Sequence, residues 1–156
     1  MNIFLNKKIL IYGLGKSGLS AFRFLKNKSD VFLYDDYEFK IKNLDIKKKT
    51  INYKNISKST FDVIILSPGI DINKCKLSKF LKKNNSKIYS DLDVFYSFYK
   101  NDCITITGTN GKSTTCQMMY EILANQKFDV KLVGNIGNPI LSVKNIKKKT
   151  FFVIEA

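Results

Sequence analysis

Residues 9–20 have the sequence Ile-Leu-Ile-Tyr-Gly-Leu-Gly-Lys-Ser-Gly-Leu-Ser, and this stretch decides the predicted fold. Its first four residues form an apolar run typical of a buried strand, and residues 17–26 carry apolar side chains at helical spacing. A complete G-x-G-x-x-G motif joins them, with Gly13, Gly15 and Gly18 as its glycines. The first glycine permits a tight turn, the second lets a phosphate approach the backbone, and the third lets helix and strand pack closely. The stretch therefore predicts a strand, a phosphate-binding turn and a helix whose free N–H groups face an anion.

Short apolar runs and helix-like segments alternate along the rest of the chain, which predicts an α/β protein with parallel sheets. The predicted strands are residues 9–12, 31–34, 61–66, 87–89, 103–107, 130–133 and 151–154. Between residues 37 and 60 the pattern fades into Lys- and Asn-rich sequence, where we expect variable surface structure.

We place a domain boundary between residues 92 and 101 and divide the chain into residues 1–93, a Rossmann-like sheet, and residues 94–156. The second part has only three predicted strands, and the chain stops directly after the last of them. We therefore expect it to be truncated, and the glycine motif at residues 105–114, described below, makes it the start of a P-loop ATPase domain. We expect the two parts to form separate parallel sheets.

Composition excludes several classes of protein. The chain has 27 basic and 13 acidic residues, a net charge of +14, but the only arginine is Arg23. Sites that read nucleic acids favour arginine, so we expect no nucleic-acid partner. Three cysteines without a C-x-x-C pair, and no histidine, predict neither a disulfide framework nor a zinc site. Without a signal peptide or an apolar run of ~20 residues, we expect a cytoplasmic protein with no membrane insertion.

A second glycine motif occupies residues 105–114, Thr-Ile-Thr-Gly-Thr-Asn-Gly-Lys-Ser-Thr. It is a short G-x-x-G-K-S form of the phosphate-binding P-loop, because Ile106 stands where the longer form has its first glycine. Backbone N–H groups of such a loop wrap phosphate oxygens, Lys112 supplies a point charge, and the Ser113 hydroxyl can reach Mg²⁺. The motif predicts a phosphate-binding loop.

The octapeptide T-G-T-N-G-K-S-T at residues 107–114 resembles the ATP loop shared by the Mur ligases and the folylpolyglutamate synthetases, and only the Mur ligases have a Rossmann-like unit before it. Three further segments are similar to the Mur ligase that adds D-glutamate, and they occur in the family order. They are residues 13–20 (G-L-G-K-S-G-L-S), 67–70 (S-P-G-I) and 134–137 (G-N-I-G). Residues 153–156 (V-I-E-A) also match a strand end of that family.

The resemblance implies two substrate sites. The ATP site would comprise Gly108, Thr109, Asn110, Gly111, Lys112, Ser113 and Thr114. The UDP site would comprise Gly13, Gly15, Lys16, Ser17, Asp35, Asp36, Ser67, Pro68 and Gly69, with Asn135 at the muramoyl end. Ser113 and Glu155 would hold Mg²⁺, and Lys112 and Glu155 would serve catalysis. The residues alone also place Asp35 about 20 positions after the first motif, where an acid often meets a ribose hydroxyl of NAD or of a UDP-sugar.

The implied reaction joins D-glutamate to UDP-N-acetylmuramoyl-L-alanine at the expense of ATP, through an acyl phosphate. We expect the full-length protein to be a monomer and residues 1–156 alone to be inactive. Two alternatives stay open. One is a ligase of the same superfamily that adds another amino acid, and the other is a Rossmann nucleotide-binding module without ligase activity.

Overall fold

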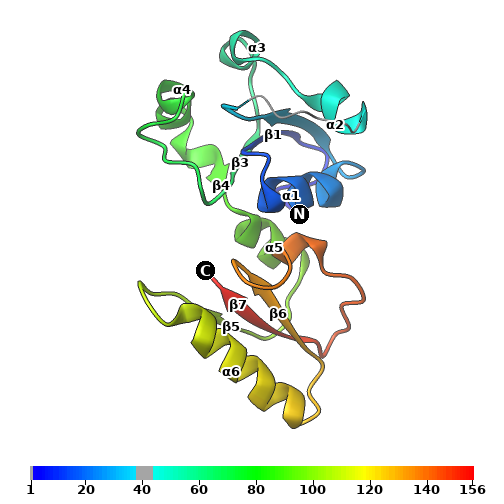
Figure 1. Cartoon of the computed structure of the whole chain (residues 1–156). Helices are drawn as coiled ribbons and strands as arrows, with labels where there is room; N and C mark the ends of the chain where they lie inside the picture. The colour runs from blue at the N-terminus through cyan, green and yellow to red at the C-terminus, as the bar shows by residue number, and fades with distance from the viewer. Residues whose placement is uncertain (1, 38–43) are drawn as a thin grey trace. The chain divides into compact units, whose positions relative to one another are not determined.

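The computed structural model describes residues 2–37 and 44–156. It divides the chain into two compact units, residues 1–98 and 99–156 (Figure 1). The four-stranded sheet of the first unit and the three-stranded sheet of the second are separate, and every strand pair is parallel. This confirms the predicted α/β class with two parallel sheets. Among the described residues, none of the helices combines the length and the apolar character that crossing a membrane requires.

The sheet of the first unit has the strand order β2-β1-β3-β4. Its strands are β1 (Lys8–Tyr12), β2 (Asp30–Tyr34), β3 (Val63–Leu66) and β4 (Ile88–Tyr89). Residues 9–12 are fully buried because β1 pairs on both sides, with β2 and with β3. The strands that the apolar runs predicted are therefore present, with ends shifted by one or two residues.

The strand order reverses between β1 and β3, so the connections leaving these two strands run in opposite directions along the sheet. Open α/β sheets bind ligands at such a switch point, at the carboxyl ends of the strands. Helix α1 (Lys16–Leu25) follows β1 there, and the Ser67–Pro68–Gly69 turn follows β3. Both segments that the sequence assigned to the first site thus leave the same edge of the sheet.

Two short helices occupy the stretch where the sequence pattern fades. They are α2 (Leu44–Lys49) and α3 (Tyr53–Ser57), and each buries one isoleucine, Ile46 or Ile56. A single apolar residue in a Lys- and Asn-rich segment gives no periodicity, which is why the sequence did not predict these helices. Residues 38–43 of the same stretch lie outside the described residues.

Helix α5 (Asp91–Phe98) ends the first unit. The structure divides the chain after Phe98, within the predicted interval of residues 92–101, whereas a division after residue 93 falls inside this helix. The difference has a physical reason: Val94 and Phe95 are fully buried, and the Phe98 ring packs edge-on against Phe24 of α1 at 5.0 Å. The remaining helical segments of this unit are α4 (Ser78–Lys83) and the 3-10 turn η1 (Asn85–Lys87).

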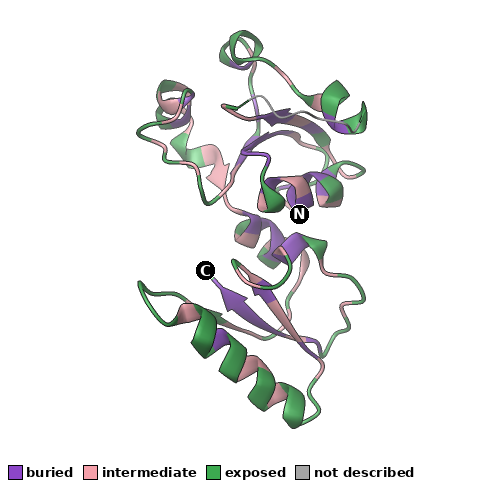
Figure 2. Cartoon of the chain, in the orientation of Figure 1, coloured by how far each residue is buried: buried purple, intermediate pink, exposed green. Residues whose placement is uncertain are grey.

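The second unit has the strand order β5-β7-β6. Its elements are β5 (Cys103–Ile106), α6 (Lys112–Asn125), β6 (Val130–Gly134), the 3-10 turn η2 (Ile140–Ser142) and β7 (Phe151–Glu155). The central strand β7 is buried from Phe152 to Glu155, whereas most of α6 is exposed (Figure 2). Cys116 is the one fully buried residue of α6, and it packs against Val130 and Val153.

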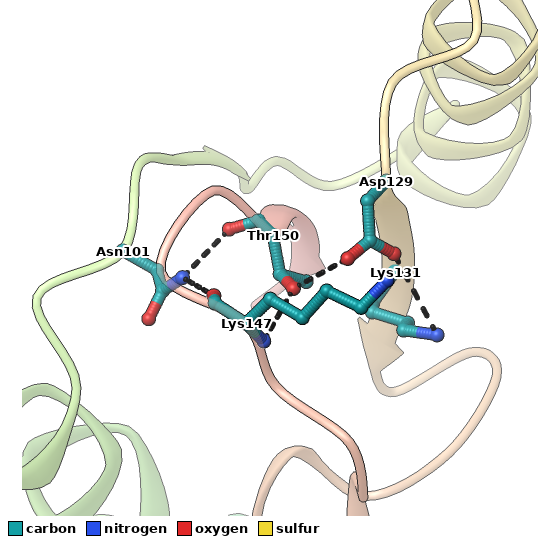
Figure 3. Close-up of polar contacts among 5 residues, drawn as sticks. All are labelled: Asn101, Asp129, Lys131, Lys147 and Thr150. Carbon is teal, nitrogen blue, oxygen red and sulfur yellow. Dashed lines mark hydrogen bonds and ion pairs between the residues drawn. The ribbon is translucent and has the colours of Figure 1, made fainter.

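A polar cluster ties the amino ends of the three strands of this unit together (Figure 3). The Asn101 side-chain amide donates to the main-chain oxygens of Lys147 and Thr150, both at 2.8 Å. The Thr150 hydroxyl, which is buried, donates to Asp129 Oδ2 at 2.7 Å and accepts from the Lys147 N–H. Because the Asn101 amide nitrogen, the Thr150 hydroxyl and Asp129 are bonded within the fold, we assign this cluster to stability and not to ligand binding.

Candidate functional site

The first glycine loop connects β1 to α1 in a shape that only glycine allows at two positions. Gly13 has a φ of +96°, and a side chain there would meet Ser67 at 2.7 Å. A Cβ atom on Gly18 would lie 1.8 Å from the main-chain oxygen of Gly13. Helix α1 therefore touches the turn that precedes it, as the third glycine of the motif predicts.

Gly15 differs from these two glycines. It is the N-cap of α1 with a φ of −70°, and a Cβ atom built on it meets nothing within 4 Å. The N-cap offers no side-chain acceptor, and the first turn of α1 carries no acidic residue. Gly15 and Lys16 are exposed. The start of α1 is thus an open, positively polarised helix end of the kind that binds anions.

Ser67 braces the loop from the neighbouring strand. Its hydroxyl donates to the main-chain oxygen of Gly13 at 2.8 Å, and its side chain fills the space that a residue larger than glycine would need at position 13. Pro68 and Gly69, the other two residues of the predicted Ser-Pro-Gly segment, are exposed. The structure therefore brings Ser67 to the loop as a support, and leaves the two residues after it accessible.

Asp35 reaches the loop from the end of β2. Its Oδ2 accepts a hydrogen bond from the Leu14 N–H at 2.6 Å, and its Oδ1 accepts one from the Tyr37 N–H at 3.0 Å. Asp35 was predicted as a ligand of a ribose or uridine group. Both carboxylate oxygens already hold the backbone, although each retains a lone pair for a further donor.

Asp36 points toward a loop that the sequence analysis missed, which runs from Asp71 to Leu77. Its Oδ2 accepts from the Lys76 N–H at 3.1 Å, and its main-chain oxygen accepts from Lys76 Nζ at 2.6 Å. Within the described residues, Asp36 Oδ1 and the Tyr12 hydroxyl are buried without a well-formed hydrogen bond. Burial, with Cys75 and Asp36 beside it, raises the pKa of Tyr12 far above its ordinary value.

A cavity of about 640 Å³ lies over the carboxyl end of β2, beside the glycine loop. Burial, with a smaller effect of Asp36, raises the pKa of the Tyr34 phenol in its wall to about 12. Other residues of the wall are Leu14, Asp35, Asp36, Tyr53, Asn55 and Lys76. The cavity mixes aromatic rings with amide and carboxylate groups, which suits a planar polar ring such as a nucleobase.

The second glycine loop connects β5 to α6 in the other unit. Gly108 has a φ of +146°, and Gly111, the N-cap of α6, has a φ of +76°. The Lys112 ammonium donates to the main-chain oxygen of Gly108, so the side chain folds back across its own loop. Thr109, Asn110 and Thr114 are exposed. The loop is thus open to solvent, and the Lys112 ammonium lies across it. Helix α6 begins there and has no acidic residue in its first turn.

Ser113 and Glu155, which are 42 residues apart in the sequence, meet in this unit. The Ser113 hydroxyl lies 3.1 and 3.3 Å from the two carboxylate oxygens of Glu155. The parallel register pairs Ile106 at the end of β5 with Glu155 at the end of β7, which carries the carboxylate to the start of α6. The contact agrees with the predicted pairing of these two residues at one site.

Glu155 is only 6% exposed, and the ion pairs of the described residues do not include it. A buried carboxylate without a cation is costly. Mg²⁺ takes oxygen ligands and is commonly held by one or two carboxylates together with substrate phosphates. A hydroxyl and a carboxylate next to a phosphate loop fit that ion. Among the described residues no group of three or more acidic, cysteine or histidine side chains is placed to hold a metal ion, so other ligands would have to complete the coordination.

Asn135 lies in the second unit, in the turn that follows β6. Its N–H donates to the main-chain oxygen of Glu155 at 3.2 Å, so it is a neighbour of Glu155 within that unit. Asp91, at the start of α5, is the polar residue near the first loop that the sequence analysis missed. It is buried and accepts a hydrogen bond from Ser17.

Residues 7–89 match the model of the Mur ligase MurD-like N-terminal domain, and residues 106–156 match that of the Mur ligase middle domain. The first match covers more than half of the 156 residues. The chain belongs to the Mur ligase family. This confirms the resemblance that the glycine motifs carried.

Curated relatives include two proteins described as UDP-N-acetylmuramoylalanine--D-glutamate ligase. The one from Rickettsia prowazekii (strain Madrid E) is 40% identical over 151 residues, which is 92% of this chain and 33% of the relative. The one from Lachnoclostridium phytofermentans is 37% identical over 163 residues, with 97% and 36% covered. The chain thus spans about a third of the length of the curated relatives it matches.

Solved structures support the fold. The UDP-N-acetylmuramate:L-alanyl-gamma-D-glutamyl-meso-diaminopimelate ligase from Neisseria meningitides aligns with a TM-score of 0.54 at 18% identity, over 97% of this chain and 52% of that one. The UDP-N-acetylmuramate-alanine ligase from Thermotoga maritima aligns with a TM-score of 0.51 at 18% identity, over 96% and 37%.

Proposed function

We propose that the chain is the nucleotide-binding part of an ATP-dependent ligase that adds D-glutamate to UDP-N-acetylmuramoyl-L-alanine in peptidoglycan synthesis. The observation that carries the proposal is the presence of two open glycine loops, each joining a strand to a helix in a different unit, one of them next to a buried carboxylate. An amide ligase of this kind needs one anion site for its nucleotide-linked substrate and another for ATP. The names of the relatives supply the substrates.

The first loop would hold the UDP group. The main-chain N–H groups at the start of α1 would face the diphosphate, with Gly15 giving access and Lys16 adding charge. The cavity over β2 would take the uracil ring between Asp35, Asp36 and Tyr53. Pro68 and Gly69 would border the same edge of the sheet, and Asn135 would contact the muramoyl end.

The second loop would hold ATP and position its γ-phosphate. The residues from Gly108 to Thr114 would surround the phosphates, and Lys112 would leave the Gly108 oxygen to contact a phosphate oxygen. Ser113 and Glu155 would hold Mg²⁺, which would neutralise charge on the transferred phosphoryl group. The L-alanyl carboxylate of the substrate attacks the γ-phosphorus and releases ADP. The amine of D-glutamate then attacks the acyl phosphate, and inorganic phosphate leaves as the amide forms.

Replacing Gly15 with valine is expected to weaken binding of UDP-N-acetylmuramoyl-L-alanine to this chain at least about tenfold. The new side chain meets no protein atom at its Cβ position, so it would fill the space through which the diphosphate approaches. Isothermal calorimetry measures the affinity, and circular dichroism checks that the helical signal is unchanged.

NADH provides the matched comparison for this experiment, because a G-x-G-x-x-G loop also serves dinucleotides. Wild-type chain that prefers NADH to the UDP-sugar would contradict the proposed substrate. It would favour the reading as a Rossmann module without ligase activity.

The chain of 156 residues is expected to bind ATP and the UDP-sugar without forming the amide. Our proposal assigns the two loops to the UDP-sugar and to ATP and gives the amine of D-glutamate no binding site, and positioning of two reactants contributes several kcal/mol to such a reaction. A coupled assay of ADP release, with ATP, UDP-N-acetylmuramoyl-L-alanine and D-glutamate, measures this. Turnover that depends on D-glutamate would show that this chain contains the complete site.

A different amino acid is the second candidate for the added group. The relatives found among solved structures include ligases named for other steps, but at 18% identity they speak for the fold alone. Testing L-alanine and diaminopimelate against D-glutamate, in a ligase that contains this chain, distinguishes the two.

A further inference from the structure

The Ser17 hydroxyl donates a hydrogen bond to Asp91 Oδ2. Ser17 lies in the first turn of α1, and Asp91 is the first residue of α5, 74 positions later. Asp91 is 9% exposed, and the ion pairs found among residues 2–37 and 44–156 do not include it. Its carboxylate therefore lies at the amino-terminal ends of two helices, where partial positive charge stabilises it.

This bond decides what Ser17 can do for a phosphate. A serine hydroxyl has one hydrogen to donate, and a phosphate oxygen offers only lone pairs. While that hydrogen is bound to Asp91, the hydroxyl has nothing to give to an anion. The bond takes no main-chain N–H from α1, so the helix end at Gly15 and Lys16 stays open for the ligand.

We propose that Asp91 is a positioning residue for the UDP site, acting through Ser17 to fix the first turn of α1. The inference rests on the proposed function, since it names what holds the diphosphate-binding helix end in place. Three side chains then hold the loop in place. Ser67, after β3, bonds to Gly13, and Asp35, after β2, bonds to Leu14. Asp91, in α5, bonds to Ser17. Ser17 then supports the loop, and main-chain N–H groups bind the phosphate.

A competing arrangement predicts the opposite effect of the Asp91 carboxylate on the affinity for a diphosphate. In this arrangement the Asp91 carboxylate lies close enough to the anion site to repel the diphosphate, and it weakens binding. In that case, removing its charge would strengthen the binding of a nucleotide diphosphate.

The experiment measures binding of UDP to the 156-residue chain and to four variants by calorimetry. Asp91→Ala and Ser17→Ala are each expected to weaken binding about tenfold, because each breaks the same charge-assisted bond. The double variant is expected to be no weaker than either single one. Asp91→Asn retains an acceptor and is expected to stay within about threefold of wild type.

Asp93→Ala is the matched control on the same helix. Asp93 accepts from the N–H and the hydroxyl of Ser90, so its loss removes one half of the capping pair of α5 without touching the glycine loop. Equal losses in Asp93→Ala and Asp91→Ala would overturn the proposal in favour of a general role in helix stability. Tighter binding by Asp91→Asn would overturn it in favour of repulsion, and additive losses in the double variant would make Ser17 a direct ligand.

Hydrogen exchange separates this inference from the proposed function. In Asp91→Ala, the amides of residues 14–19 are expected to exchange at least about tenfold faster than in wild type, whereas Asp93→Ala should leave them unchanged. Wild-type chain that binds no UDP would refute the proposed substrate, and the exchange rates would still decide whether Asp91 holds the loop. Unchanged exchange in Asp91→Ala would refute the positioning role.

Discussion

Replacing Lys112 with alanine is expected to lower the turnover of a ligase that contains this chain at least about 100-fold. The ammonium lies over the second glycine loop, bonded to the Gly108 oxygen, and is the cation of that loop closest to where phosphate would bind. Without this ammonium, no side chain of the loop neutralises the negative charge that develops on the transferred phosphoryl group. Single-turnover release of ADP measures the chemical step separately from nucleotide binding.

Lys149→Ala is the control for this prediction, because it removes the same charge from an exposed side chain outside the loop. It should leave turnover within about twofold of wild type, as expected for a surface substitution. Similar losses in both variants would mean that overall charge, and not the position of Lys112, governs the reaction.

Gly18→Ala is expected to destabilise the first unit by about 3 kcal/mol or more, at the upper end of the cost of overpacking. The added methyl group would lie 1.8 Å from the Gly13 oxygen and 3.0 Å from the Ser67 hydroxyl, so α1 must move away from the loop. For a unit of this size, the melting temperature should fall by at least about 10 °C. Thermal unfolding followed by circular dichroism gives the shift.

The same substitution three residues earlier provides the comparison. Gly15→Ala adds a methyl group that meets nothing within 4 Å, on a residue with negative φ, so the melting temperature should change by no more than about 3 °C. Equal melting temperatures of Gly18→Ala and Gly15→Ala would show that the fold does not require the close approach of α1 to the glycine turn.

Strands and glycine loops were predictable because their signals are local. The apolar run at residues 9–12 and the glycines that follow it fix a buried strand, a turn and a helix start within ten residues. The same holds for β5 and the loop before α6. Glu155 could be placed because an acidic residue at the end of a parallel strand emerges at the edge where the loops lie.

The supporting contacts were not predictable, because they join residues far apart in sequence. Ser67 was expected to line a cleft, but its hydroxyl holds Gly13, 54 residues away. Asp91 gave no signal at all. Helix α5 itself could have been found, since Ser90 and Asp93 have the spacing of a helix-capping pair ahead of Val94 and Phe95.

The strand order β5-β7-β6 has a consequence for how the second unit is made on the ribosome. Among the strands of the described residues, β5 and β6 are both paired with β7 and not with each other, so they have no strand partner among these elements until β7 has been synthesised. The first unit, in contrast, can pair β1 with β2 once residue 34 has emerged. Vectorial synthesis thus lets strand pairing in the first unit begin early, whereas pairing in the second unit begins when residues 151–155 insert between β5 and β6. During that interval the apolar side chains of α6 and β6 are exposed to chaperones and to other nascent chains.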